Sequence, residues 1–289
     1  TADGLVDLVV LNESAPAVQV LVAQGGLPFA APVPTHFGPI QEFDVGDVNG
    51  DGWPDVVGIG HAAPTALQAH LGDGLGGFPT AGTGVDLAAG GLVFGLLLLD
   101  IDEDGDLDAL IAQSSGLRKC LGDGTGGFGF PAPAVSPNAI AVHGLHALDA
   151  NSDGHVDLMY PANALFNTAW VVLLGDGQGT FSASQVGYAS PDGDIYGSAL
   201  GDFDGDHRTD FVMSNTNLAC GCDELAFAQG TGSDFVPTSF FSPLSHVPAP
   251  SHTSLRVGDL DRDGVAHVVG IEGTPRLLPG HGAFTLGPP

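Results

Sequence analysis

The sequence predicts an all-β protein, a β-propeller of about six four-stranded blades. Three observations lead to this fold class. A nine-residue acidic segment returns about every 50 residues, which is the length of one four-stranded blade. A glycine-rich segment returns in register with it, and short apolar runs separate the two. Gly and Pro, 45 and 21 of the 289 residues, punctuate these runs as tight turns do between strands.

The acidic segment begins with Asp in every complete copy. The copy at 100–108 reads Asp-Ile-Asp-Glu-Asp-Gly-Asp-Leu-Asp. The other complete copies occupy 47–55, 149–157, 202–210 and 259–267. We expect each copy to form a loop between the first and second strands of its unit. A shortened copy with Asp3 and Asp7 begins the chain, so the first strand of that unit is expected before Thr1.

The glycine-rich segment follows each acidic segment and reads Leu-Gly-Asp-Gly-x-Gly-Gly-Phe. It occupies 71–78 and 121–128, and 174–181 has Thr in place of the last Gly. Weaker copies end at Phe235 and Phe284. Glycine-rich turns between apolar runs are typical of hairpins. We expect the final Phe to open the fourth strand of each unit and to pack between blades.

The two motifs define the expected repeats, which together form a single domain. Their approximate bounds are 1–40, 41–92, 93–141, 142–195, 196–251 and 252–289. A single four-stranded sheet cannot bury both of its faces, whereas sheets stacked around an axis can. Seven blades are expected instead of six if the chain is incomplete. Because no apolar run approaches the ~18 residues of a membrane helix, no membrane span is expected.

The acidic segments predict calcium sites. Oxygen ligands at positions 1, 3, 5 and 9, with Gly at position 6, suit Ca²⁺, whereas Mg²⁺ prefers a smaller and stricter octahedron. The candidate ligands are Asp47, Asn49, Asp51, Asp55, Asp100, Asp102, Asp104, Asp108, Asp149, Asn151, Asp153, Asp157, Asp202, Asp204, Asp206, Asp210, Asp259, Asp261 and Asp263. In the copy at 100–108, Asp106 is expected to add its main-chain oxygen. We expect about four to five ions; acidic surface turns without metal are the alternative.

The predicted sites are unequal. His207 stands where Gly is expected at position 6, so we expect a strained turn in the copy at 202–210. His267 replaces the last Asp of the copy at 259–267, which predicts a weak or empty site. None of the copies is an EF-hand, because that loop needs a bidentate Glu at position 12 and flanking helices.

At this point the two motifs resemble the FG-GAP/VCBS repeat family, and the resemblance covers almost the whole chain. It rests on acidic segments such as 100–108 and on glycine-rich turns such as 121–128. The resemblance implies a calcium-bearing propeller like those of integrin α-subunits, some fungal and bacterial lectins and many secreted bacterial proteins. It does not imply one function, because this fold carries several.

Charge restricts the expected partners. Six Lys and Arg stand against 34 Asp and Glu, a formal charge of −28, so the surface repels nucleic acids and anionic lipids. We expect a secreted module at or beyond the cell surface that binds a glycan or an extracellular protein in adhesion. The alternative is an extracellular structural protein that polymerises as a filament or surface layer. A strand from a neighbouring chain would then complete its first blade, although a longer natural chain explains that blade more simply.

Catalytic motifs do not stand out, so an enzyme is not expected. Eleven histidines are scattered along the chain, and neither a Gly-x-Ser-x-Gly elbow, a His-Glu-x-x-His helix nor a phosphate loop accompanies them. The three cysteines are Cys120, Cys220 and Cys222. They are either small buried or loop thiols, or Cys120 pairs with one of the other two.

Overall fold

The computed structural model describes most of the chain, and its regular elements in these ranges are β-strands, which confirms the all-β class. The described residues are 5, 7–12, 17–24, 33–34, 40–60, 66–82, 84–87, 92–114, 116–133, 144–164, 167–190, 195–217, 222–231, 235–241, 254–259, 264–272 and 274–278. The chain divides into two compact units, Thr1–Asn138 and Ala139–Pro289.

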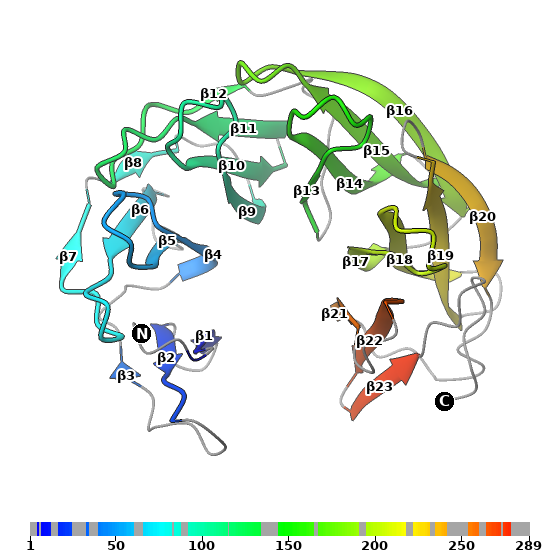
Figure 1. The fold of residues 1–289 in the computed structure, drawn as a ribbon, viewed down its shortest axis with the longest axis horizontal. Helices are drawn as coiled ribbons and strands as arrows, with labels where there is room; N and C mark the ends of the chain where they lie inside the picture. The colour runs from blue at the N-terminus through cyan, green and yellow to red at the C-terminus, as the bar shows by residue number, and fades with distance from the viewer. Residues whose placement is uncertain are drawn as a thin grey trace. The chain divides into compact units, whose positions relative to one another are not determined.

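The first unit contains three antiparallel sheets (Figure 1). The first sheet has the order β1 (Leu8–Asn12), β2 (Ala17–Leu21) and β3 (Val33–Pro34). The second has β4 (Ile40–Gly46), β5 (Asp55–Gly60), β6 (Ala66–Leu71) and β7 (Thr80–Ala81), and β8 (Val85–Asp86) also pairs with β6. The third has β9 (Val93–Leu99), β10 (Asp108–Gln113), β11 (Gly116–Cys120) and β12 (Ala132–Pro133).

The second unit also contains three antiparallel sheets. The fourth sheet has the order β13 (His146–Leu148), β14 (Asp157–Ala164), β15 (Asn167–Gly175) and β16 (Phe181–Ser190). The fifth has β17 (Ile195–Gly201), β18 (Asp210–Asn217), β19 (Cys222–Gly230) and β20 (Phe235–Phe241). The sixth has β21 (Ser254–Gly258), β22 (His267–Glu272) and β23 (Thr274–Leu278).

Apart from β8, strands follow one another in chain order within these sheets, so each sheet is a meander. The acidic segments connect the first and second strands of five sheets. The residue pairs that close these loops are Gly46 with Asp55, Leu99 with Asp108, Leu148 with Asp157, Gly201 with Asp210, and Gly258 with His267. Closure of the sheets into a ring, the number of blades and the repeat bounds stay predictions.

The core lies between stacked sheets within each unit. In the first unit, Val57 and Ile59 of the second sheet pack in one cluster with Ala109 and Ile111 of the third. Every residue of β10 is buried, as expected for a strand covered on both faces. Each large apolar side chain buried in this way contributes about 1.5–3 kcal/mol.

In the second unit, Trp170 of the fourth sheet packs in a cluster with Phe211 and Met213 of the fifth. Cys120 in the first unit is a buried free thiol, and burial raises its pKa to about 11. The disulfide expected as an alternative for Cys120 is therefore absent. None of the described segments is a helix long and apolar enough to cross a membrane.

Candidate metal centres

The acidic loop at 100–108 is held by bonds from its own backbone to its side chains. Asp100 accepts the N–H of Asp104 on Oδ1 at 3.1 Å and the N–H of Gly105 on Oδ2 at 3.0 Å. Asp104 Oδ1 accepts the N–H of Asp106 at 2.9 Å. Glu103 and Gly105, at positions 4 and 6, have positive φ angles of 58° and 97°. These two left-handed residues fold the chain tightly enough to bring alternate side chains together.

Three carboxylates converge in this loop. Asp100, Asp102 and Asp104 each offer an oxygen, and the three oxygens lie within 4.8 Å of one another. Asp102 Oδ1 is buried and has no hydrogen-bond partner. Leaving a buried acceptor unpaired costs about 1–3 kcal/mol, more for a charged group, and neighbouring carboxylates repel it further. An all-oxygen set with an unsatisfied buried oxygen fits a Ca²⁺ ion, whose charge would offset both costs.

The last Asp of the loop has a second role that sequence reasoning missed. Asp108 is buried and accepts two backbone N–H groups, from Ile101 on Oδ2 at 2.9 Å and from Gly122 on Oδ1 at 2.7 Å. It therefore fastens the acidic loop to the start of the glycine-rich turn. The same two bonds recur at Asp55, Asp157 and Asp210. In the sequence the glycine-rich segment follows the acidic segment in each repeat. This order alone does not reveal the contact between the two segments.

Burial raises the pKa of the last Asp in these loops. Burial is the largest cause of the raised pKa at Asp55, Asp108 and Asp157. Nearby carboxylates raise the pKa of these residues further, and the two backbone N–H bonds lower it. At Asp210 burial raises the pKa to about 6. Ionisation of the last Asp is therefore less favourable than in water, and positive charge added nearby would favour it.

The loop at 202–210 gathers a different triplet. Carboxylate oxygens of Asp202, Asp204 and Asp210 lie within 4.8 Å of one another. His207, at position 6, has a φ of 65°, which for a residue with a side chain carries the strain that the sequence predicts. Gln229 of β19 donates its side-chain N–H to Asp204 Oδ2.

In the two loops with Asn at position 3, the amide group takes part in the turn. Asn49 donates from Nδ2 to Asp51 Oδ2 at 2.9 Å and accepts the N–H of Asp51 on Oδ1 at 3.0 Å. Asn151 makes the same pair of bonds with Asp153 at 2.8 and 3.0 Å. Among the described residues, triplets of converging carboxylates occur in the loops at 100–108 and 202–210, not in these two.

The remaining predicted ligands are only partly placed. Asp259 Oδ2 accepts the N–H of Gly264 at 3.0 Å, and the buried His267 lies with Nδ1 3.2 Å from the carbonyl oxygen of Val265. Asp261 and Asp263 lie outside the described residues, as does Asp3. In the shortened first copy, Asp7 Oδ1 accepts the N–H of Ala23 at 2.8 Å, as the last Asp does elsewhere.

The Asp of each glycine-rich turn stabilises that turn. Asp123 Oδ1 accepts the N–H groups of Thr125 and Gly127 at 2.8 and 2.9 Å, and Asp73 and Asp176 do the same in their turns. A side-chain bond from Thr125 and these backbone bonds lower the pKa of Asp123. These acids are therefore satisfied within the turn, as acids at tight turns often are.

One serine–histidine contact was not expected. His146 Nε2 of β13 lies 2.8 Å from Ser198 Oγ of β17, so it joins the first strands of the fourth and fifth sheets. Burial lowers the pKa of His146 to about 4, which keeps the imidazole neutral at pH 7. Ser198 is only 8% exposed, so its hydroxyl has little access to a substrate. This contact is best explained as a link between sheets.

Comparison with known proteins connects the repeats to one family. The model of the FG-GAP-like repeat matches residues 1–58, 47–111 and 100–160, which together span more than half of the chain. No curated protein sequence matches significantly.

Many solved structures resemble the chain, and two of them illustrate the likeness. An Agrocybe aegerita lectin, solved to explain specific recognition of non-reducing terminal N-acetylglucosamine, is 20% identical with a TM-score of 0.69. That alignment covers 100% of this chain and 77% of the lectin. The V. cholerae biofilm matrix protein Bap1 is 17% identical with a TM-score of 0.49, over 86% of this chain and 37% of that chain. The likeness to the lectin extends over the whole chain and concerns the fold.

Proposed function

Because this chain belongs to the FG-GAP-like repeat family, we propose that it is a calcium-binding β-propeller that acts outside the cell as a glycan-binding module. The observation that carries the calcium assignment is the cluster of Asp100, Asp102 and Asp104, with its unpaired buried oxygen. These three side chains and the main-chain oxygen of Asp106 would hold the ion. Calcium would neutralise the cluster and fix the loop between the first two strands of its sheet.

An extracellular location agrees with the chemistry of these loops. Oxygen-only sites of extracellular modules bind Ca²⁺ with Kd values of about 10⁻⁴–10⁻³ M, which calcium outside cells can fill. A formal charge of −28 also favours a role that needs neither nucleic acid nor anionic membrane. The proposed role is binding rather than catalysis, and the serine–histidine contact does not argue against it, since its Ser198 is buried.

A glycan is the first ligand to test because the lectin that shares this fold over the whole chain recognises one. Terminal N-acetylglucosamine is therefore the first probe, on a glycan array with and without Ca²⁺. We expect calcium-dependent binding to a defined set of glycans. An array without signal, on protein that is folded and calcium-loaded, would overturn the glycan assignment and leave the calcium assignment standing.

The calcium assignment has its own test, thermal and chemical unfolding in Ca²⁺, in Mg²⁺ and in EDTA. Binding to the native state alone adds about 2.7 kcal/mol per site at a hundredfold excess of ligand over Kd. We expect Asp102→Ala to lose one such increment and Asp123→Asn, in a turn without a predicted ion, to keep it. Equal unfolding curves in Ca²⁺ and EDTA would rule the calcium sites out.

Self-assembly into a filament or surface layer stays a prediction. Light scattering and electron microscopy in Ca²⁺ and in EDTA test it directly. Large particles that need calcium would favour the structural role, and compact monomers in both conditions would favour the binding module.

A further inference from the structure

The chain contains one Asn-Gly step, and this step lies in an acidic loop. Asn49 occupies position 3 and Gly50 position 4 of the loop at 47–55. The loop at 149–157 also has an Asn at position 3, Asn151, but Ser152 follows it. The two loops therefore form a natural pair for comparing the residue that follows the Asn.

The two Asn side chains make the same hydrogen bonds. In each loop the Asn Oδ1 accepts the N–H of the Asp at position 5 at 3.0 Å. The Asn Nδ2 donates to Oδ2 of the same Asp, at 2.9 Å from Asn49 and 2.8 Å from Asn151. Both Asn residues are half-buried, and the residues after them are exposed. An N–H that donates to Oδ1 also stabilises negative charge that develops on that oxygen, so both amides are equally prepared for attack at Cγ.

The residues after the two Asn differ in the freedom of their backbone nitrogen. Gly50 has a φ of 70°, and a Cβ at this position would meet no atom within 4 Å. Within the described part of the chain, no acceptor is paired with the N–H of Gly50. Ser152 has a similar φ of 62°, but its Cβ restricts the rotation that would turn its nitrogen toward the preceding side chain.

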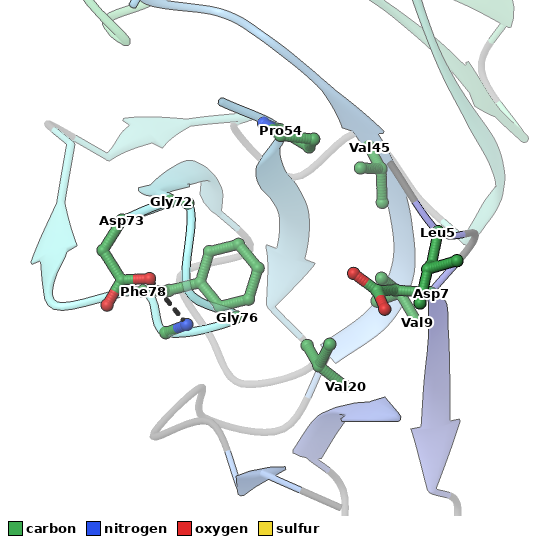
Figure 2. Close-up of a pocket in the computed structure, with 12 residues that line it drawn as sticks. Leu5, Asp7, Val9, Val20, Val45, Pro54, Gly72, Asp73, Gly76 and Phe78 are labelled. Atoms are coloured by element: carbon green, nitrogen blue, oxygen red, sulfur yellow. Dashed lines mark hydrogen bonds between the residues drawn. The ribbon is translucent and has the colours of Figure 1, made fainter. Parts of the chain in front are cut away.

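The end of the loop at 47–55 is held firmly, in contrast to Gly50. Asp55 accepts the N–H of Val48 on Oδ2 at 2.9 Å and the N–H of Gly72 on Oδ1 at 2.7 Å. Pro54 and Gly72, which line the pocket drawn in Figure 2, lie against each other, and a Cβ on Gly72 would clash with the carbonyl oxygen of Pro54. Gly50 thus lies in the exposed middle of a fixed loop, where water reaches it.

We propose that Asn49 is a site of spontaneous deamidation. The nitrogen of Gly50 attacks Cγ of Asn49, the bond from Cγ to Nδ2 breaks, and Nδ2 leaves as ammonia with the proton of the Gly50 N–H. Water then opens the resulting cyclic imide at either of its carbonyl groups. The products are Asp or isoaspartate at position 49, each with one new carboxylate. Gly permits the ring closure because no side chain opposes it.

The modification changes the electrostatics of the loop. As Asp, residue 49 no longer donates to Asp51 Oδ2 and faces that carboxylate with like charge. The loop then has acids at positions 1, 3, 5 and 9, as the loop at 100–108 has, where three carboxylates converge. As isoaspartate, residue 49 adds a methylene group to the main chain between positions 3 and 4. Both products should therefore make the calcium-free loop less stable than the amide form.

The test is incubation of the whole, folded chain in EDTA at mildly alkaline pH, with the fold checked by circular dichroism. Peptic digestion in acid then stops the reaction, and mass spectrometry detects the replacement of NH₂ by OH at each Asn. We expect residue 49 to be converted at least about tenfold faster than residue 151, because Gly lacks the side chain that hinders ring closure. Equal rates at the two residues, or no conversion of residue 49, would overturn the proposal.

Reciprocal variants exchange the two following residues. Gly50→Ser should slow the conversion of Asn49 to the rate of Asn151, and Ser152→Gly should accelerate that of Asn151 about tenfold. The backbone accepts both changes, since Gly50 has space for a side chain and Ser152 already has a positive φ. Unchanged rates in the two variants would also refute the proposal.

The variant Asn49→Asp reproduces one product and tests its consequence. It should melt at a lower temperature than the wild type in EDTA, because a carboxylate replaces the amide that donates to Asp51. A melting temperature equal to that of the wild type would contradict the effect on the loop. All these measurements are made without calcium or sugar, so the proposed function can fail or hold separately.

Discussion

The acidic loops at 100–108 and 202–210 share a nine-residue pattern, but the acid at position 3 has different contacts in the two loops. In the first, Asp102 Oδ1 is buried without a partner. In the second, the equivalent Asp204 receives a side-chain N–H from Gln229. The first also has Gly105 at the left-handed position 6, where the second has His207. The first loop leaves a buried carboxylate oxygen without a donor, whereas the second supplies a donor to the equivalent acid from within the protein.

The acidic loop has two tasks, fastening and the proposed ion binding, and the converging acids divide them in the first loop but share Asp210 in the second. Fastening the loop falls to the last Asp, whose two backbone bonds are the same in both loops. The proposed ion would be held by the acids that converge, which are those at positions 1, 3 and 5 in the first loop and those at positions 1, 3 and 9 in the second. Substitution of the last Asp should therefore lower the free energy of unfolding by similar amounts in the two loops. Substitutions at other positions should have different effects in the two loops.

The largest expected effect comes from removing the last Asp. Asp108→Ala leaves the buried N–H of Ile101 and that of Gly122 without an acceptor, at about 3 kcal/mol in total. Asp210→Ala removes the equivalent two bonds, so it should reduce the free energy of unfolding by about as much. Part of this loss is offset because the variant also removes an unfavourably buried carboxylate, whose pKa burial raises to about 6. Urea unfolding in EDTA measures both. A loss below 1 kcal/mol in both variants would contradict the fastening role.

The next effect is a pH dependence of the calcium-free protein. The pKa of Asp210 is raised to about 6, so the native state binds more protons than the unfolded state between about pH 4 and 6. This group's contribution to stability is full below pH 4 and is lost as pH rises through 6, by about 2 kcal/mol. Unfolding free energies in EDTA should fall over that window. Asp210→Asn should remove more of the slope than Asp108→Asn; equal slopes would contradict the difference between the loops.

Much of this arrangement could be predicted from the sequence, because the spacing of acids and glycines in a tight loop has few solutions. The position of the loop between the first and second strands follows from apolar runs such as 108–112, which flank it. The left-handed position 6 follows from Gly in most copies. The role of Asp108 could not be predicted, since its bond to Gly122 spans another hairpin and leaves no local pattern.

The serine–histidine contact and Gln229 show the same limit. His146 and Ser198 are 52 residues apart and meet only because their sheets pack together. Gln229 stands where the other repeats have Leu71, Leu121 and Leu174, so its polarity was visible as a departure from the repeat. Its partner, Asp204, depends on how a strand end faces a loop, which the motif does not encode.

A smaller effect should come from the left-handed residue at position 6. His207 has a φ of 65°, where a residue with a side chain costs roughly 1 kcal/mol relative to Gly. His207→Gly should therefore stabilise the protein by about that amount. Gly105→Ala, in a position where a Cβ meets no atom within 4 Å, should destabilise it equally through the backbone alone. Thermal unfolding in EDTA measures the pair, and a destabilised His207→Gly variant would contradict the expected strain.

The smallest and most selective effect exchanges the residues that distinguish the two loops. Gln229→Leu removes the donor from Asp204, so the variant should lose about 0.5–1 kcal/mol in EDTA and recover part of it in Ca²⁺. Leu121→Gln places an amide at the equivalent position beside Asp102, whose Oδ1 lacks a partner. It should stabilise the calcium-free protein and reduce the gain from Ca²⁺. Opposite shifts in the two variants, read from melting curves with and without Ca²⁺, would establish that an internal donor substitutes for part of an ion's charge; shifts in the same direction would refute it.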